Sequence, residues 1–235
     1  MNVRRMPRIL RSLLVALPLV AAACGSAEPP RSRPASGEIA RRDAAAEPLS
    51  APRRIVFLGD SLTAGLGLPR EQSTPSLIQD RLRADGYPYE VINAGVSGDT
   101  SAGGLSRLEW SLDGEVEVLI VELGANDGLR GLPVAQMKRN LGEIITRAKA
   151  RDITVILTGM EAPPNYGPQY TAEFRNAFRE LADDHDVDFV PFYLDGVAGN
   201  PSLNNPDGIH PNAEGARIIA GTLWRVLEPI LDKDR

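Results

Sequence analysis

Short apolar runs alternate with amphipathic segments from residue 53 to the C-terminus. The runs 55–58 and 118–121 are almost continuous in isoleucine, valine, leucine and phenylalanine, which is typical of strands covered on both faces. The pattern predicts five strands, at residues 54–58, 89–93, 116–123, 154–158 and 187–191.

Two segments outside these strands repeat apolar residues every three or four positions. Residues 133–149 and 212–230 have this spacing and are predicted to be amphipathic helices. Residues 71–84, 102–112 and 170–185 show a weaker helical pattern. Strands that alternate with helices predict an α/β domain with a parallel sheet, right-handed crossovers and helices on both faces.

Polar, glycine-rich motifs follow four of the predicted strands. Ser61 comes just after the first strand, S-G-D-T (97–100) after the second and G-A-N-D (124–127) after the third. D-G-I-H (207–210) follows the fifth strand after a longer loop. Ligands of open parallel sheets bind beyond the carboxyl ends of the strands, so we expect one site that combines these motifs.

A serine nucleophile needs a base, and the chain has only two histidines. His185 lies in the charged run D-D-H-D, whereas Asp207 precedes His210 by three residues and can orient its ring. The pattern favours a serine hydrolase with Ser61, His210 and Asp207 as catalytic residues. The alternative is structural: Ser61 in a strand-end turn, and Asp207 with His210 in a turn that enters a helix.

Other common chemistries lack support in the sequence. The chain has no G-x-S-x-G elbow, no complete dinucleotide fingerprint and no Walker motif. It has one candidate site histidine and no available thiol, so we expect neither a metal nor a cofactor.

Acyl transfer also requires hydrogen-bond donors for the developing oxyanion. The candidates are the backbone amide of Ser61, a glycine amide in N-A-G-V-S-G-D-T and the side-chain amide of Asn126. The residues alone leave Gly95 and Gly98 equally possible. Turn formation after a strand is the alternative role for these glycines and for Asn126.

The acyl-binding side is predicted less sharply. Residues 160–170 follow the fourth strand and contain candidate wall residues, with an ordinary proline-rich loop as the alternative; the candidates are Met160, Pro164, Tyr166 and Tyr170. Residues 192–206 are either a lid or a surface excursion.

The N-terminal region predicts export. Residues 1–24 combine basic residues with an apolar stretch that is too short to span a bilayer. The only cysteine, Cys24, follows small residues, and this sequence resembles a bacterial lipobox, which implies lipidation; the alternative is an ordinary signal peptide. Residues 25–52 read as a disordered tether and residues 53–235 as one domain. We therefore expect an exported, membrane-anchored lipoprotein, periplasmic or at the cell surface.

Net charge bears on partners. The chain carries a formal charge of −5, which argues against a nucleic-acid partner and gives no attraction to anionic lipid. Membrane attachment would therefore depend on the acyl chains of the anchor.

The motifs G-D-S-L, S-G-D-T, G-A-N-D and D-G-I-H-P, in this order, resemble the four blocks of the SGNH (GDSL) hydrolase family. The runs V-E-L-G-A-N-D-G-L-R-G and A-P-P-N-Y-G-P-Q-Y resemble its bacterial esterase, thioesterase and lysophospholipase branch. The resemblance covers residues 54–230 and implies a flavodoxin-like three-layer α/β/α sandwich. One departure is Thr74 before Pro75, where branch members usually have an aromatic residue.

The resemblance also implies the site residues. Ser61 is the expected nucleophile, His210 the base and Asp207 its orienting acid. The expected oxyanion hole consists of the Ser61 and Gly98 amides and Asn126, so the alignment of S-G-D-T selects Gly98 over Gly95.

The expected activity is hydrolysis of carboxylic esters, aryl or acyl, through an acyl-enzyme. Thioesters and lysophospholipids are further candidate substrates. Two alternatives remain open on the sequence: a carbohydrate O-acetylesterase with the same triad, and a non-catalytic surface protein that binds lipid or glycan. The partner is a small ester or lipid, and the sequence does not indicate an oligomeric state.

Overall fold

The computed structural model describes residues 52–233. The predicted signal (1–24), the lipidation site Cys24 and the tether (25–52, except Pro52) lie outside the described residues and stay predictions. No helix within residues 52–233 is long and apolar enough to cross a membrane.

The strands form one parallel five-stranded sheet, as predicted. Its members are β1 (Arg53–Gly59), β2 (Tyr89–Gly95), β3 (Val116–Glu122), β4 (Thr154–Thr158) and β5 (Asp188–Val190). Their spatial order is β2-β1-β3-β4-β5, which is the flavodoxin-like order. The centre of the sheet is β1 and β3, where residues 55–58 and 118–121 are completely buried. Burial on both faces explains their nearly continuous apolar sequence.

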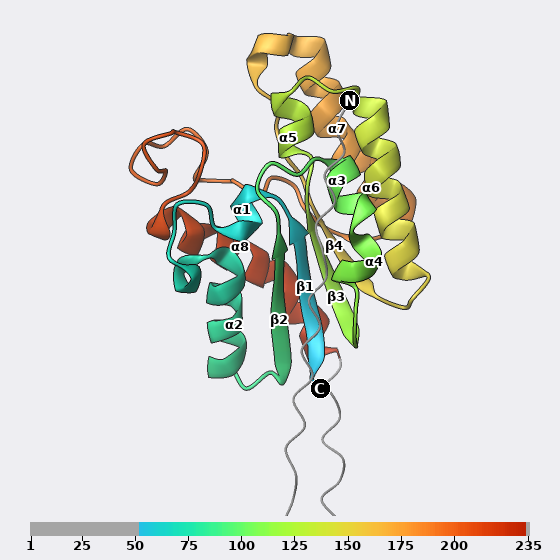
Figure 1. The fold of residues 1–235 in the computed structure, drawn as a ribbon, viewed down its shortest axis with the longest axis vertical. Helices are drawn as coiled ribbons and strands as arrows, with labels where there is room; N and C mark the ends of the chain where they lie inside the picture. The colour runs from blue at the N-terminus through green and yellow to red at the C-terminus, as the bar shows by residue number, and fades with distance from the viewer. Residues whose placement is uncertain (1–51, 234–235) are drawn as a thin grey trace, which may run out of the picture. The chain divides into compact units, whose positions relative to one another are not determined.

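Helices cover both faces of the sheet (Figure 1). One face carries α2 (Thr74–Ala84) and α8 (Ala213–Asp232), which pack against each other. The other carries α3 (Ser101–Ser106), α4 (Leu108–Ser111), α6 (Val134–Lys149) and α7 (Pro168–His185). The three-layer α/β/α sandwich is thus confirmed.

The helical segments differ from the predictions mainly in the short elements. The predicted helix 102–112 is two helices, α3 and α4, separated at Arg107. The weak segment 71–84 is a 3-10 turn, η1 (Arg70–Gln72), followed by α2. A second 3-10 turn, η2 (Pro164–Tyr166), precedes α7.

Two unpredicted helices start directly after the central strands. They are α1 (Ser61–Ala64) after β1 and α5 (Ala125–Leu129) after β3. The Asp60 side chain caps α1 by accepting a 3.0 Å hydrogen bond from the Leu62 amide. Gly124 precedes α5 with φ of 112°, a conformation that favours glycine. Both helices therefore lie at the carboxyl edge of the sheet.

Candidate active site

Ser61 is the first residue of α1 and lies where β1 ends. Its carbonyl accepts hydrogen bonds from the amides of Gly65 (3.1 Å) and Leu66 (3.0 Å), which close the short helix. A Cβ atom on Gly59 would lie 2.0 Å from the Thr63 hydroxyl oxygen. Glycine at the end of β1 therefore lets the chain turn back tightly and present Ser61 at the sheet edge.

His210 approaches Ser61 from a segment 149 residues away in the sequence. Its Nε2 lies 2.9 Å from Ser61 Oγ, and its Nδ1 lies 2.8 Å from Asp207 Oδ2. The structure thus brings together the three residues that the sequence indicated. His185 ends α7, which leads into the amino end of β5, so it lies at the other edge of the sheet.

Asp207 holds the ring of His210 from an exposed turn. Its Oδ1 accepts 3.0 Å hydrogen bonds from the amides of Ile209 and His210. These backbone bonds, with the bond to the His210 ring, lower the pKa of Asp207 to about 2. An ionised carboxylate only accepts hydrogen bonds, so Nδ1 is the protonated ring nitrogen. Nε2 is then free to accept the proton of Ser61.

The structure separates the two glycines that the residues alone left open. Gly98 has φ of 86° and lines the same cavity as Ser61. Gly95 ends β2, and a Cβ atom there would lie 2.3 Å from the Ala64 amide nitrogen. Gly95 therefore packs beneath α1, whereas Gly98 faces the cavity.

The residues that carry the three expected oxyanion donors, Ser61, Gly98 and Asn126, line the same cavity. Asn126 lines the cavity from α5, and its side-chain nitrogen donates a 2.9 Å hydrogen bond to Asp60 Oδ2. Among the residues that the structure describes, the amides of Ser61 and Gly98 donate to no other group. A tetrahedral oxyanion beside Ser61 is a suitable acceptor for such donors.

The cavity at the sheet edge has a volume of about 780 Å³ and mostly apolar walls. Met160 and Pro164, two of the predicted substrate residues, line it. The segment 192–206 forms part of the wall through Phe192, Leu194, Ala198, Gly199 and Asn204. Whether this segment acts as a lid stays a prediction. Thr74 and Pro75, the departure from the family pattern, are buried at the start of α2 and lie outside the cavity lining.

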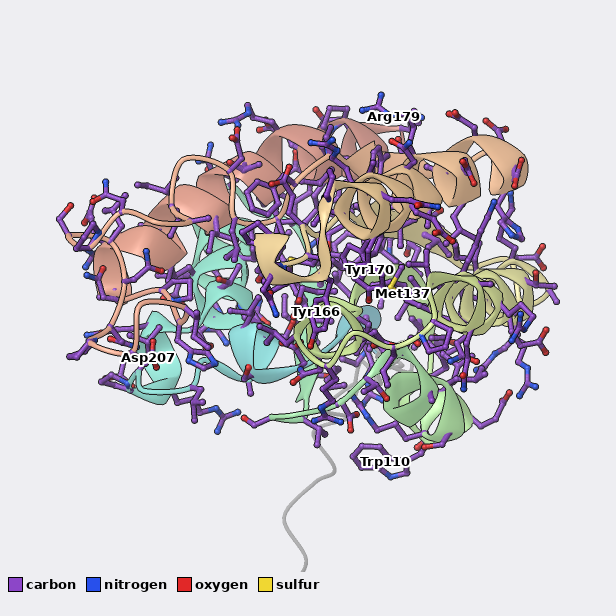
Figure 2. All side chains as sticks on the ribbon, turned by 90° about the horizontal axis from the view of Figure 1, so that it is seen from above. Trp110, Met137, Tyr166, Tyr170, Arg179 and Asp207 are labelled. Carbon is purple, nitrogen blue, oxygen red and sulfur yellow. The ribbon has the colours of Figure 1, made fainter. Side chains whose placement is uncertain are left out.

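Tyr166 and Tyr170 are not among the residues that line the cavity. Their rings contact each other at 5.3 Å, and Figure 2 shows them together and apart from Asp207. Their hydroxyls donate to the carbonyls of Leu129 (3.0 Å) and Leu132 (2.8 Å). In this geometry Tyr166 ties η2 to the end of α5, and Tyr170 ties the first turn of α7 to the loop between α5 and α6.

Sequence reasoning missed two buried acids near the site. Asp127 accepts hydrogen bonds of 2.7 Å from both the amide and the hydroxyl of Ser101, which ties α5 to the start of α3. Glu122 is fully buried at the end of β3 and bonds to α1. The sequence signal for Glu122 was an acidic residue within the otherwise apolar run V-L-I-V-E-L.

The sequence between residues 57 and 218 matches the model of the GDSL-like Lipase/Acylhydrolase family. The chain belongs to this family. The predicted resemblance to SGNH (GDSL) hydrolases is therefore confirmed, and the order of strands agrees with it.

Several relatives of this SGNH hydrolase carry names that describe an activity. Esterase TesA of Pseudomonas aeruginosa is 42% identical over 183 residues, which are 77% of this chain and 91% of the relative. An arylesterase of Vibrio mimicus is 40% identical over 171 residues, 72% of this chain and 86% of the relative. Thioesterase 1/protease 1/lysophospholipase L1 of Escherichia coli K12 is 36% identical over 181 residues, 77% and 86% of the two chains.

Solved structures agree with the fold. The crystal structure of TesA superposes with a TM-score of 0.72 at 41% identity and covers 75% of this chain and 98% of that one. The psychrotrophic esterase EstA from Pseudoalteromonas sp., inhibited by monoethylphosphonate, gives a TM-score of 0.72 at 35% identity. That match covers 76% of this chain and 98% of EstA.

Proposed function

We propose that the protein is a serine esterase that hydrolyses carboxylic esters through an acyl-enzyme. The observation that carries this proposal is the continuous contact from Ser61 Oγ to His210 Nε2 (2.9 Å) and from His210 Nδ1 to Asp207 (2.8 Å). In the proposed first step Ser61 Oγ bonds to the acyl carbon while His210 Nε2 takes the hydroxyl proton. The carbonyl electron pair moves to oxygen and forms the oxyanion.

The proposed oxyanion hole comprises the amides of Ser61 and Gly98 and the side chain of Asn126. His210 then returns its proton to the leaving alcohol as the bond to the acyl carbon breaks. Water repeats the sequence in place of Ser61, releases the carboxylic acid and restores the serine hydroxyl. Asp207 stays ionised and stabilises the imidazolium formed in each half-reaction.

The substrates we propose are aryl and acyl esters, together with thioesters and lysophospholipids. The names of the relatives and the apolar cavity of about 780 Å³ support this range. Met160 and Pro164 are the proposed contacts of the acyl group. For Tyr166 and Tyr170 we propose a supporting role, because neither lines the cavity and their hydroxyls donate to the backbone carbonyls of Leu129 and Leu132.

The decisive test replaces Ser61 by alanine. We expect the Ser61→Ala variant to lose hydrolysis of p-nitrophenyl butyrate and labelling by a fluorophosphonate probe, because both need the activated hydroxyl. Ser106→Ala is the matched control, since Ser106 is exposed and donates only to the Gly103 carbonyl. Full activity or labelling in the Ser61→Ala variant would contradict the proposal.

A chain-length series separates the ester alternatives. The size and apolar walls of the cavity favour acyl groups longer than acetyl, so p-nitrophenyl butyrate and octanoate should be cleaved with higher kcat/KM than the acetate. Cleavage restricted to acetyl groups on sugars would instead support the O-acetylesterase. Binding of lipid without turnover of any ester would support the non-catalytic alternative.

We also propose that the protein is exported and anchored to a membrane through acylated Cys24. The support is in the sequence alone, where the single cysteine follows a basic and then apolar segment. Detergent-phase partitioning and mass spectrometry of the full chain test this, with Cys24→Ser as the control. An unmodified Cys24 in the mature protein would refute the anchor.

A further inference from the structure

Glu122 occupies the space beneath α1. It is the last residue of β3 and has 0% exposure. Its Oε2 accepts hydrogen bonds from the Asp60 amide (3.3 Å), the Thr63 amide (3.2 Å) and the Thr63 hydroxyl (2.8 Å). One buried oxygen thus satisfies three donors in the turn that presents Ser61.

The other oxygen of Glu122 indicates its ionisation state. Oε1 is buried and has no hydrogen-bond partner among the described residues. Complete burial and the nearby charge of Asp60 raise the pKa of Glu122 well above its usual value. Burying a carboxylate charge beside an unpartnered oxygen costs far more free energy than burying the neutral acid, so we assign a proton to Glu122, with Oε2 as the carbonyl acceptor.

Asp60 is the neighbouring acid and differs in its partners. Burial raises its pKa, while hydrogen bonds from the Leu62 amide and the Asn126 side chain, and the charge of His210, oppose that rise. Hydrogen bonding by Glu122 lowers it further. The proton of this pair therefore resides on Glu122, and Asp60 is the carboxylate that holds Asn126.

We propose that neutral Glu122 is a positioning residue that fixes Ser61 through α1 and Asn126 through Asp60. Its bond to the Asp60 amide comes one residue before Ser61. Asp60 Oδ2 accepts one N–H of the Asn126 amide at 2.9 Å, which leaves the second N–H for the oxyanion. The proposal rests on the proposed esterase function and adds a residue that does not touch the substrate.

The neutral state is chemically suited to this place. An ionised Glu122 would put a second negative charge beside Asp60, in a site that stabilises a developing oxyanion. An apolar side chain would leave the amides of Asp60 and Thr63 and the Thr63 hydroxyl without their buried acceptor. Within residues 52–233, Tyr193 also faces Glu122, and its hydroxyl is buried.

Two variants of the full chain separate positioning from packing. Glu122→Gln keeps a carbonyl acceptor and adds donors at the other position, so we expect kcat to stay within about threefold of the wild type. Glu122→Leu keeps the size and removes the acceptor, and we expect kcat to fall about 10- to 100-fold while KM changes less than about twofold. Glu117→Gln, at the opposite end of β3, is the control for an acid-to-amide substitution on this strand.

Two readouts are independent of ester turnover. ¹³C NMR of labelled glutamate should show the Glu122 carboxyl protonated at pH 7, with Glu122→Gln as the assignment control. The ¹⁵N resonance of the Asn126 side chain should move in the Glu122→Leu variant and return in the Glu122→Gln variant. These readouts test Glu122 even if the wild-type protein cleaves no ester, a result that would defeat only the proposed function.

Three results would overturn the proposal. They are an ionised Glu122 at pH 7, a Glu122→Gln variant whose kcat falls as far as that of Glu122→Leu, and a folded Glu122→Leu variant with unchanged kcat. If Glu122→Leu fails to fold, the protonation state and the Glu122→Gln kinetics still decide the question.

Discussion

Ser61 and His210, the proposed nucleophile and base, lie 2.9 Å apart, yet they come from parts of the molecule that are held in different ways. Ser61 follows the central strand β1, and the amide of the preceding residue, Asp60, donates a hydrogen bond to buried Glu122. Asp207 and His210 lie between β5 and α8 in a stretch without regular helices or strands, and the Asp207 side chain is 47% exposed. The nucleophile is thus positioned by the core, and the base by local turns.

Two backbone hydrogen bonds close the segment that carries Asp207 and His210. The Asn205 amide donates to the His210 carbonyl at 2.7 Å, and the Asn212 amide donates to the Leu203 carbonyl at 2.9 Å. Exposed segments of this kind open at lower free energy than buried strands. Substitutions on the nucleophile side should therefore affect chemistry, whereas those on the base side should also affect how long the active geometry persists.

The largest expected effect is loss of the base itself. His210→Ala should lower kcat/KM by roughly 10⁴-fold or more, because no other imidazole reaches Ser61. The chain offers one matched control, since His185 is its only other histidine and lies at the opposite edge of the sheet. His185→Ala should retain wild-type kinetics with p-nitrophenyl butyrate. Equal loss in the two variants would contradict the assignment of His210.

On the nucleophile side, Asn126→Ala should lower kcat by about 10²- to 10³-fold with little change in KM, as expected for a lost oxyanion donor. The substitution also removes the 2.9 Å partner of buried Asp60. Asn176→Ala, on the exposed face of α7, is the control. A rise in KM without a fall in kcat would show that Asn126 binds substrate rather than the oxyanion.

The segment that carries His210 should respond differently when a side chain that stabilises it is removed. Buried Asn204 donates from Nδ2 to the carbonyls of Val197 (2.7 Å) and Asn200 (2.8 Å). Asn204→Ala removes two buried hydrogen bonds, although each carbonyl keeps one bond from a backbone amide, and should destabilise the segment by about 1–3 kcal/mol. We expect faster proteolysis and amide exchange between β5 and α8 and a moderate loss of kcat/KM, measured against Ser202→Ala. Unchanged exchange would show that other contacts hold this segment.

The same contrast explains what the sequence made predictable. Strands 55–58 and 118–121 were recognisable because burial on both faces demands continuous apolar residues. Helices α1 and α5 were not, since four or five residues are too few to show a period. The predicted helix 102–112 breaks at Arg107, which bonds to the carbonyls of Gly59 and Ala94 at the strand ends. Such long-range contacts leave no periodic signal.

Some residues of the site were predictable from the sequence and others were not. Scarcity of histidine and the D-x-x-H spacing identified His210 and Asp207, and the family pattern selected Gly98. Glu122 was missed because its partners are backbone and side-chain groups of another segment, which only the fold brings near. Tyr166 and Tyr170 were predicted as acyl contacts, but the direction of each ring depends on the distant carbonyl that its hydroxyl binds, Leu129 for one and Leu132 for the other.

The smallest expected effect concerns acid and again falls on the base side. The pKa of Asp207 is about 2 in the folded protein, below its value of about 3.9 in an unfolded chain. A lowered folded pKa contributes stability that is present above the unfolded value and is lost as pH falls through the folded one. The difference in unfolding free energy between the wild type and Asp207→Asn should therefore be constant from pH 7 to about 5 and shrink below about pH 4. Urea unfolding at several pH values measures it, and a difference that grows on acidification would contradict the Asp207 geometry.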